Sequence, residues 1–179
     1  MSTTHDAPGL PLNHALLPEN TCFGCSAHNP VGLHVEIRRD PDAPETLVAQ
    51  LAPSELHAGF PGIVHGGVLF SALDCLAAWV PTILRSGTKA IWILRTARIT
   101  FHRATRVGTH VTLRGSIVPG TETAQELAVQ TEARDESGAL LADAEFTVRS
   151  LPPDKFRRVA GGIDIPAGWR RLLGIEPTD

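Results

Sequence analysis

The sequence predicts an α+β fold in which an antiparallel sheet of about five to six strands wraps around one long central helix. The longest apolar run of the chain, residues 61–84, contains a helix-forming stretch that is apolar on nearly every side, and such a helix is normally enclosed by its own protein. The segments around it have strand patterns with no helical period between them, which excludes a βαβ parallel sheet. A sheet wrapped around the helix would bury both apolar surfaces.

A hairpin and a loop are predicted before the helix. Residues 33–40 alternate apolar and polar side chains, which is typical of a strand. Residues 46–53 form a second strand-like segment after a turn at 40–44. Residues 54–67 are rich in glycine, so we expect a loop there.

The helix is predicted over residues 68–80, because residues 68–78 contain no Gly or Pro. Pro81 cannot donate to the helical ladder and is expected to kink or end the helix near its last turns. The turns predicted at 119–120 and 135–138 separate the strands that follow. These strands cover residues 90–104, 110–118, 123–134 and 139–150.

A length of 179 residues suits one domain with irregular ends. We expect residues 1–20 to be an N-terminal arm, either loose or folded into a short helix. Residues 21–151 would be the folded domain, and residues 152–179 a C-terminal surface tail that ends in a short segment near Trp169. The tail carries a basic cluster of Lys155, Arg157 and Arg158.

Composition excludes several classes of partner. The net charge of −3 gives no electrostatic footprint for nucleic acid. The apolar run at 68–84 is at the short limit for a membrane span and carries Asp74 and Pro81, so we expect no membrane partner. Residues 1–20 show no signal peptide, and an odd number of cysteines favours a reducing compartment. We therefore expect a cytoplasmic protein.

Asp74 lies in the middle of the apolar helix, where an ionised carboxylate is unfavourable unless it has a partner or a function. His65, Gly66 and Gly67 stand where the helix should begin. Glycine there lets a ligand approach the free N–H groups of the first turn, and the positive end of the helix dipole suits an oxyanion. A helix end that polarises an electrophile and a buried carboxylate together outline an acyl-transfer or hydrolysis site. The alternative is structural, with a tight Gly-Gly turn and an Asp74 salt-bridged to a core arginine.

The cysteines are interpreted as structural. Cys22 and Cys25 have the spacing of a zinc knuckle, with His28 and His34 as possible further ligands. No second cysteine pair follows, so a packed turn is the favoured interpretation. Cys75 is expected to be a small core residue. We therefore predict no metal site and no cofactor.

Three segments together resemble a known family. They are CFGCSAHNPVGLHV at 22–35, FPGIVHGGVLFSALD at 60–74 and TARITFHR at 96–103. With the order of elements, they resemble the hot-dog-fold acyl-CoA thioesterases, in the group that includes phenylacetyl-CoA thioesterases and thioesterase-superfamily relatives. The resemblance covers about residues 20–150. It implies hydrolysis of an acyl-CoA to the free acid and coenzyme A by a homodimer or homotetramer with sites at the subunit interface.

The resemblance also implies roles for individual residues. Asp74 matches the family's general base or nucleophile, and Gly66 or Gly67 matches the backbone N–H that polarises the thioester carbonyl. Thr96 matches a threonine that holds the water in some relatives. His65 is expected to orient the loop rather than act as a base.

Four further residues are candidates for substrate binding. Arg103 and Arg106 follow the Thr96 strand, where relatives often contact coenzyme A phosphates, and arginine suits phosphate geometry. Phe70 is a candidate for the acyl pocket, although core packing is its default role. Several relatives carry an Asn six residues before the histidine of HGG. Gly59 stands at that position here, so His57 is the polar candidate nearby.

Two other functions compete with hydrolysis. One is a hot-dog dehydratase or hydratase acting on acyl thioesters, in which His57 and Asp74 would form the acid–base pair. The related hydratases pair an Asp with a His five residues later, where this chain has Trp79. The other is a non-catalytic acyl-CoA-binding protein, which would have no need for a buried carboxylate.

Overall fold

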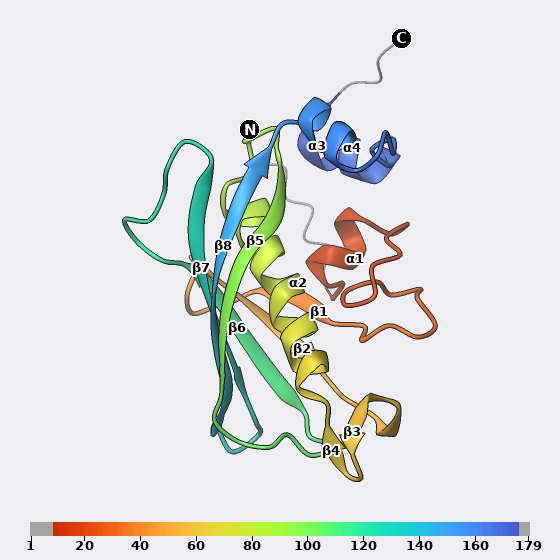
Figure 1. The fold of residues 1–179 in the computed structure, drawn as a ribbon, viewed down its shortest axis with the longest axis vertical. Helices are drawn as coiled ribbons and strands as arrows, with labels where there is room; N and C mark the ends of the chain where they lie inside the picture. Colours follow the sequence, from red (N-terminus) through yellow and green to blue (C-terminus); the bar gives the residue numbers. More distant parts are fainter. Residues whose placement is uncertain (1–8, 176–179) are drawn as a thin grey trace.

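The structure is a computed structural model that describes residues 9–175. Its main element is a six-stranded antiparallel sheet with the order β1-β2-β6-β7-β8-β5, and the long helix α2 (Gly66–Leu84) packs against one face of it (Figure 1). The predicted α+β architecture is therefore confirmed. The strands are β1 (Glu36–Arg39), β2 (Thr46–Leu51), β5 (Ile91–Phe101), β6 (Val111–Ile117), β7 (Glu126–Arg134) and β8 (Leu140–Leu151).

The core forms between the sheet and one side of α2. Strands β6 and β7 alternate buried and half-exposed residues, as a sheet with one covered face requires. Gly115 on β6 lets the helix approach closely, since a Cβ there would lie 3.0 Å from Val80 and 3.1 Å from Leu76. More than half of α2 is buried in this way, so a helix long and apolar enough to cross a membrane is packed here as a core helix.

The helix is longer at both ends than predicted. It begins at Gly66, because the His65 side chain caps the first turn by accepting the Gly67 N–H at 2.9 Å. At the other end it continues through Pro81 to Leu84, and the Arg85 N–H closes the last turn on the Pro81 carbonyl. Pro81 itself does not end the helix, which stops three residues later at Leu84, within the last turns where a kink or an end is expected. A buried proline loses one ladder bond, and packing against the core compensates for that loss.

The segment predicted as a loop, 54–67, contains a small second sheet. A short 3₁₀ helix, η1 (Glu55–His57), leads into β3 (Ala58–Phe60), which pairs with β4 (Ile63–Val64). Gly62, with φ of +74°, allows the tight turn between them. Strands of two and three residues have no periodicity to read, which is why the sequence pattern missed them.

Strand β1 is shorter than predicted, because residues 33–35 bond elsewhere. The N–H groups of Leu33 and Val35 donate to the carbonyls of Phe23 and Gly24. This stretch is therefore bonded to the turn of residues 22–25, called the cysteine turn below, instead of to β2. His34 between them has a positive φ of 52°, which breaks the extended conformation.

The N-terminal segment forms a short helix, α1 (Leu12–Leu16), which is one of the two predicted alternatives. Asn13 is fully buried and ties the helix to the domain. Its Nδ2 donates to the carbonyls of Cys25 (2.7 Å) and Val35 (2.9 Å), and its Oδ1 accepts the Ile37 N–H at 2.9 Å. Three satisfied backbone groups thus hold the cysteine turn and β1 on one side chain.

The C-terminal segment packs against the domain, unlike the predicted surface tail. It forms α3 (Pro153–Val159) and α4 (Ala167–Leu173), and the predicted short segment near Trp169 is α4. Leu173 is buried in a small cluster with Ile91 of β5, and the Trp169 ring lies 6.3 Å from the Trp79 ring of α2. This apolar contact places α4 over the C-terminal half of the central helix.

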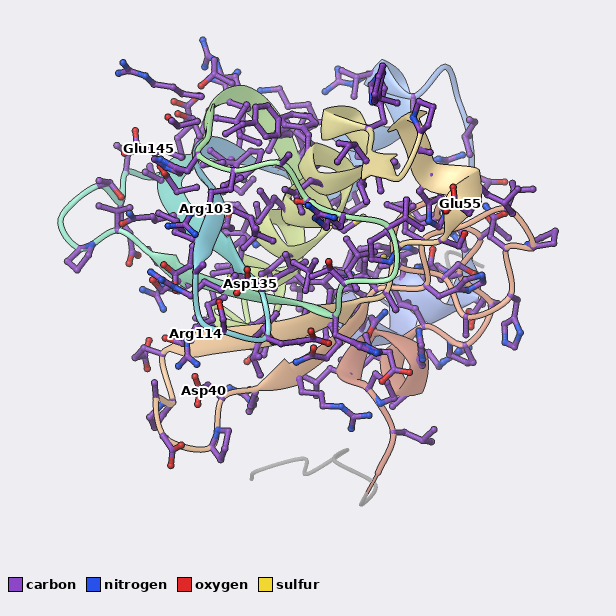
Figure 2. All side chains as sticks on the ribbon, turned by 90° about the horizontal axis from the view of Figure 1, so that it is seen from below. Asp40, Glu55, Arg103, Arg114, Asp135 and Glu145 are labelled. Carbon is purple, nitrogen blue, oxygen red and sulfur yellow. The ribbon has the colours of Figure 1, made fainter. Side chains whose placement is uncertain are left out.

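An ion pair at the end of the sheet is structural. Asp40, which follows β1, is only 5% exposed and pairs with Arg114 of β6 (Figure 2). The same carboxylate accepts the Asp42 N–H at 3.0 Å, which shapes the turn between β1 and β2. The Asp40 carboxylate therefore has both a cationic partner and a backbone donor. The half-buried carboxylate of Asp74 differs in this respect.

Candidate active site

Asp74 lies on the one side of α2 that the sheet leaves partly open. Gly67, Ser71, Asp74 and Ala78 follow one another at helical spacing and are exposed or half-exposed, whereas the opposite side is buried. The Asp74 side chain lines a cavity of about 420 Å³ whose walls come from α2, β5, the cysteine turn and the C-terminal helices. Most of this wall is apolar.

The Asp74 carboxylate has no cationic partner among residues 9–175, since none of the ion pairs in that part of the chain includes it. Burial raises the pKa of Asp74 above its ordinary value, and a negative charge on Cys22 raises it further. The structural alternative of a salt-bridged Asp74 therefore does not hold for the described chain. A raised pKa makes this carboxylate a stronger base than an exposed aspartate.

The start of α2 supplies a donor for an oxyanion. The His65 ring accepts the Gly67 N–H, and the N–H of Gly66 has no protein acceptor in the described residues. His65 thus acts as the N-terminal cap of α2. The helix dipole adds positive potential at this point.

His57 is hydrogen-bonded to the residues that precede α2. Its Nδ1 accepts the Ser54 N–H at 3.0 Å, and its carbonyl accepts the His65 N–H at 2.8 Å. The His57 side chain also lines a separate cavity of about 750 Å³, together with Val68 and His110. His57 does not line the cavity that contains Asp74.

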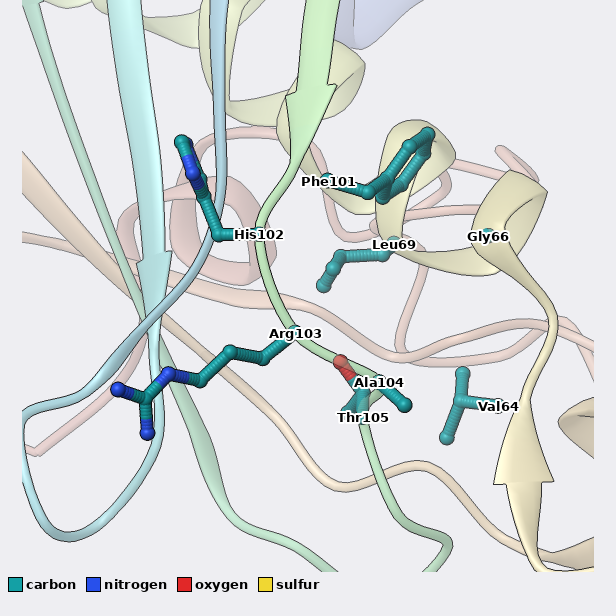
Figure 3. Close-up of a pocket in the computed structure, with 8 residues that line it drawn as sticks. All are labelled: Val64, Gly66, Leu69, Phe101, His102, Arg103, Ala104 and Thr105. Carbon is teal, nitrogen blue, oxygen red and sulfur yellow. The ribbon is translucent and has the colours of Figure 1, made fainter.

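Gly66 lines a cavity of about 310 Å³ with Phe101, Arg103 and Thr105 (Figure 3). A Cβ on Gly66 would lie 3.2 Å from the Phe101 ring, so glycine keeps this space open. The structure thus brings Arg103 to the helix start, although its guanidinium points away from Gly66 in Figure 3. Arg106 is exposed, does not line this cavity, and its backbone bridges to Ile63.

Thr96 and Phe70 lie outside both of these cavities. Thr96 is exposed on β5, opposite Thr147 of β8 and next to a bulge at Arg95. Phe70 is half-buried against the core, with its ring 5.8 Å from that of Phe146. Within one chain, Phe70 therefore packs in the way expected of a core residue.

The two halves of the predicted site are separated within one chain. Gly66 and Asp74 are eight residues apart on one helix, which corresponds to about 12 Å along its axis at 1.5 Å per residue. The cavities that they line share no residue. A water within hydrogen-bonding distance of Asp74 could not attack a carbonyl whose oxygen is bound at Gly66 of the same chain.

Sequence reasoning missed a cluster of all three thiols beside Asp74. The expected packed turn of Cys22 and Cys25 is present, but Cys75 of α2 lies on it. The Sγ atoms of Cys22 and Cys75 are 3.7 Å apart, and the three Sγ atoms lie within 4.8 Å of one another. His28 and His34, the predicted further ligands, are not part of this group. Cys75 is 50 residues further along the chain than Cys25, so no local spacing could have indicated the contact.

The three thiols share their protons unequally. Hydrogen bonds from Cys25 and Cys75 lower the pKa of the Cys22 thiol. Donation to Cys22 in turn raises the pKa values of Cys25 and Cys75, and burial adds to both shifts. Cys22 is therefore the thiol of the three that ionises most readily.

Solved structures of the same fold include thioesterases. A thioesterase of Haemophilus influenzae aligns with a TM-score of 0.60 at 17% identity, over 67% of this chain and 80% of that one. A hypothetical thioesterase of Streptococcus pneumoniae solved with coenzyme A gives 0.57 at 19%, over 66% and 86%. The Escherichia coli PaaI protein of the phenylacetic acid degradation operon gives 0.56 at 16%, over 66% and 80%. None of the curated proteins matches the chain.

The sequence profile of the thioesterase superfamily matches residues 61–141. That segment contains all of α2 with Asp74 and the HGG turn, the whole of β5 with Thr96, and strands β6 and β7, which pack against the helix. The predicted family is therefore confirmed where the candidate site lies. Residues 61–141 are a thioesterase-superfamily segment within a hot-dog fold.

Proposed function

We propose that this protein hydrolyses an acyl-CoA thioester to the free acid and coenzyme A. The observation that carries the proposal is Asp74, a half-buried carboxylate that has no cationic partner within residues 9–175 and opens into an apolar cavity. Asp74 takes a proton from a water molecule as that water attacks the thioester carbonyl carbon. The carbonyl oxygen becomes an oxyanion bound by the Gly66 N–H, and its collapse releases the coenzyme A thiolate, which takes up the proton.

The same geometry allows direct attack by Asp74. A carboxylate oxygen would then form a mixed anhydride with the acyl group, and water would open it in a second step. The two routes differ in where the solvent oxygen enters. A single turnover in ¹⁸O-water labels the acid product directly on the general-base route, whereas the nucleophilic route transfers an Asp74 oxygen to the product when water attacks the Asp74 carbonyl.

The active unit in this proposal is a homo-oligomer with its sites between chains. Asp74 and Gly66 cannot reach one carbonyl within one chain, so Gly66 must act with Asp74 of a second copy. Strand β5 is the edge of the sheet over eleven residues, with exposed residues from Arg95 to Arg98, and is the natural place for two copies to pair. Thr96 lies in this stretch and would then face the interface, where it can hold the water.

Three observations support an acyl-CoA as the substrate. The Asp74 cavity has apolar walls, including Trp92, Ile93 and Trp169, which suit an acyl group. Arg103 and Arg106 are exposed near the Gly66 turn and suit the phosphates of coenzyme A. The similar protein of Streptococcus pneumoniae was solved with coenzyme A.

The competing functions fit less well. A dehydratase or hydratase needs a second acid–base group beside the carboxylate, yet no histidine is among the residues that line the Asp74 cavity, and His57 lines another one. A protein that only binds acyl-CoA would lose nothing if Asp74 were apolar.

A panel of acyl-CoA substrates of different chain length and aromatic content tests the proposal. We expect release of free coenzyme A, detected chromatographically, from at least one substrate, with stoichiometric formation of the acid. A change in the acyl group with no release of coenzyme A would establish the dehydratase or hydratase alternative. Tight binding without any turnover would establish the binding protein.

Substitution of Thr96 tests the role of the β5 edge. Thr96→Val keeps the shape and removes the hydroxyl, so the loss of one oriented hydrogen bond should lower kcat by about 10-fold. Thr100→Val is the matched control, because Thr100 is also exposed and lies on the same face of β5 four residues later. Equal activity of the Thr96→Val and Thr100→Val proteins would show that Thr96 is only a strand residue.

A further inference from the structure

The three thiols of the chain form a group with the dimensions of a metal site. Zinc–sulfur bonds of about 2.3 Å in a tetrahedron place neighbouring sulfurs about 3.8 Å apart. The Sγ atoms of Cys22 and Cys75 are 3.7 Å apart, and the three sulfurs lie within 4.8 Å of one another. We propose that Cys22, Cys25 and Cys75 bind one soft divalent cation of the zinc class. The cluster lines the same cavity as Asp74, but the test of metal binding does not depend on the proposed activity.

Neighbouring side chains form hydrogen bonds to the cysteines of the cluster. The Trp79 Nε1 and the Asn20 Nδ2 both donate to the Cys25 Sγ at 3.4 Å, and the Asn20 Oδ1 accepts the Cys22 N–H at 3.1 Å. Such donors around a sulfur orient metal ligands and stabilise their negative charge. The side chains of Asn20 and Trp79 thus fix two of the three ligands.

Gly24, between the two cysteines of the turn, makes room for the third ligand. A Cβ at Gly24 would overlap the Cys75 Sγ, so only glycine lets the helix cysteine reach the turn. The turn itself is held by the buried Asn13 through the Cys25 carbonyl. The three ligands therefore meet because the Gly24 backbone and the Cys75 side chain lie in close contact. Packing of the core alone would not require this contact.

The cluster also has an entry path and an open position. All three cysteines line the cavity of about 420 Å³, and Cys22 is half-exposed. A cation held by three thiolates can complete its coordination with a water from this cavity. Thiolate ligands select zinc, cadmium or copper(I) over magnesium and calcium, so a soft cation is the expected occupant.

Cadmium binding tests the proposal on the reduced full chain. The chain has only three cysteines, so thiolate-to-cadmium charge-transfer absorption reports this cluster alone. We expect one Cd²⁺ per chain, displacement by Zn²⁺ but not by Mg²⁺, and protection of all three thiols from alkylation. Weak Cd²⁺ binding without thiolate charge-transfer absorption would overturn the proposal. So would thiols that remain reactive towards alkylation in the presence of saturating Cd²⁺.

Substitutions locate the site. Cys22→Ser should weaken Cd²⁺ binding by more than about 100-fold, since the loss of supporting partners alone costs about 10- to 100-fold. Trp79→Phe keeps a large aromatic ring and removes the N–H donor, and should weaken binding by about 10-fold. His28→Ala is the control, because His28 is exposed and outside the cluster. Binding by folded Cys22→Ser protein, checked by circular dichroism, that equals the wild type would contradict the assignment.

Discussion

Asp74→Asn should lower kcat by about 10²-fold or more while the protein stays folded. The amide has the shape of the carboxylate but cannot accept the proton of the attacking water, and general-base catalysis contributes about 10²- to 10⁴-fold. Stability should be maintained or increased, because the substitution removes a half-buried charge that has no cationic partner in the described chain. Steady-state kinetics on the best substrate of the panel, with urea unfolding in parallel, measure both effects.

A control on the same side of the helix makes this result specific. Ser71→Ala changes a half-exposed polar residue on the same side of α2, and its hydroxyl donates only to the Gly67 carbonyl. It should leave kcat within about 2-fold, because no step of the reaction uses that hydroxyl. Turnover by folded Asp74→Asn protein close to that of the wild type would exclude Asp74 from the chemistry and with it the proposed mechanism.

The fold could be predicted from the sequence where local patterns are long. The apolar stretch of α2 and the alternating strands β6, β7 and β8 each extend over seven or more residues, and each was found. The hairpin of β3 and β4 was missed because its strands have only three and two residues. The ends of α2 were misjudged because they depend on the His65 cap and on the packing of Pro81, and neither is a periodic signal.

The candidate site, too, could be predicted only where the signal lies within one short segment. Asp74 could be singled out because a charged residue in an apolar helix is chemically conspicuous within its own segment. The contact between Cys75 and the turn of Cys22 and Cys25 joins distant parts of the chain and follows from the tertiary fold. The cover that α4 places over the Asp74 cavity depends on contacts of Trp169 and Leu173 with distant residues. None of these long-range contacts has a sequence spacing that could reveal it.

Gly66→Pro should lower kcat by about 10²- to 10³-fold, which is the usual effect of removing one oxyanion donor. Proline deletes the N–H of Gly66 but is favoured at the first position of a helix. His65 already has the extended conformation that a residue before proline needs, with φ of −62° and ψ of 132°. The fold should therefore survive the change.

Gly66→Ala is the matched control, because it adds a Cβ at the same place and keeps the N–H. That Cβ would lie 3.2 Å from the Phe101 ring, so a small adjustment and a modest effect on kcat are expected. If the two variants lost activity equally, crowding at Phe101 would explain the result, and the Gly66 N–H would have no role as a donor.

A mixed oligomer of the Asp74→Asn and Gly66→Pro chains decides whether the site crosses the interface. If each site takes Gly66 from one chain and Asp74 from the other, a two-fold dimer of the two variants contains one site with both defects and one intact site. Heterodimers purified through two different tags should then regain about half of the wild-type activity, because one of their two sites is whole. If Gly66 and Asp74 of the same chain cooperated, every site would carry one defect and the heterodimer would be as inactive as its parents. Rescue would also explain why one helix carries both groups about 12 Å apart, since two-fold pairing of the copies would bring each group to its counterpart on the other helix.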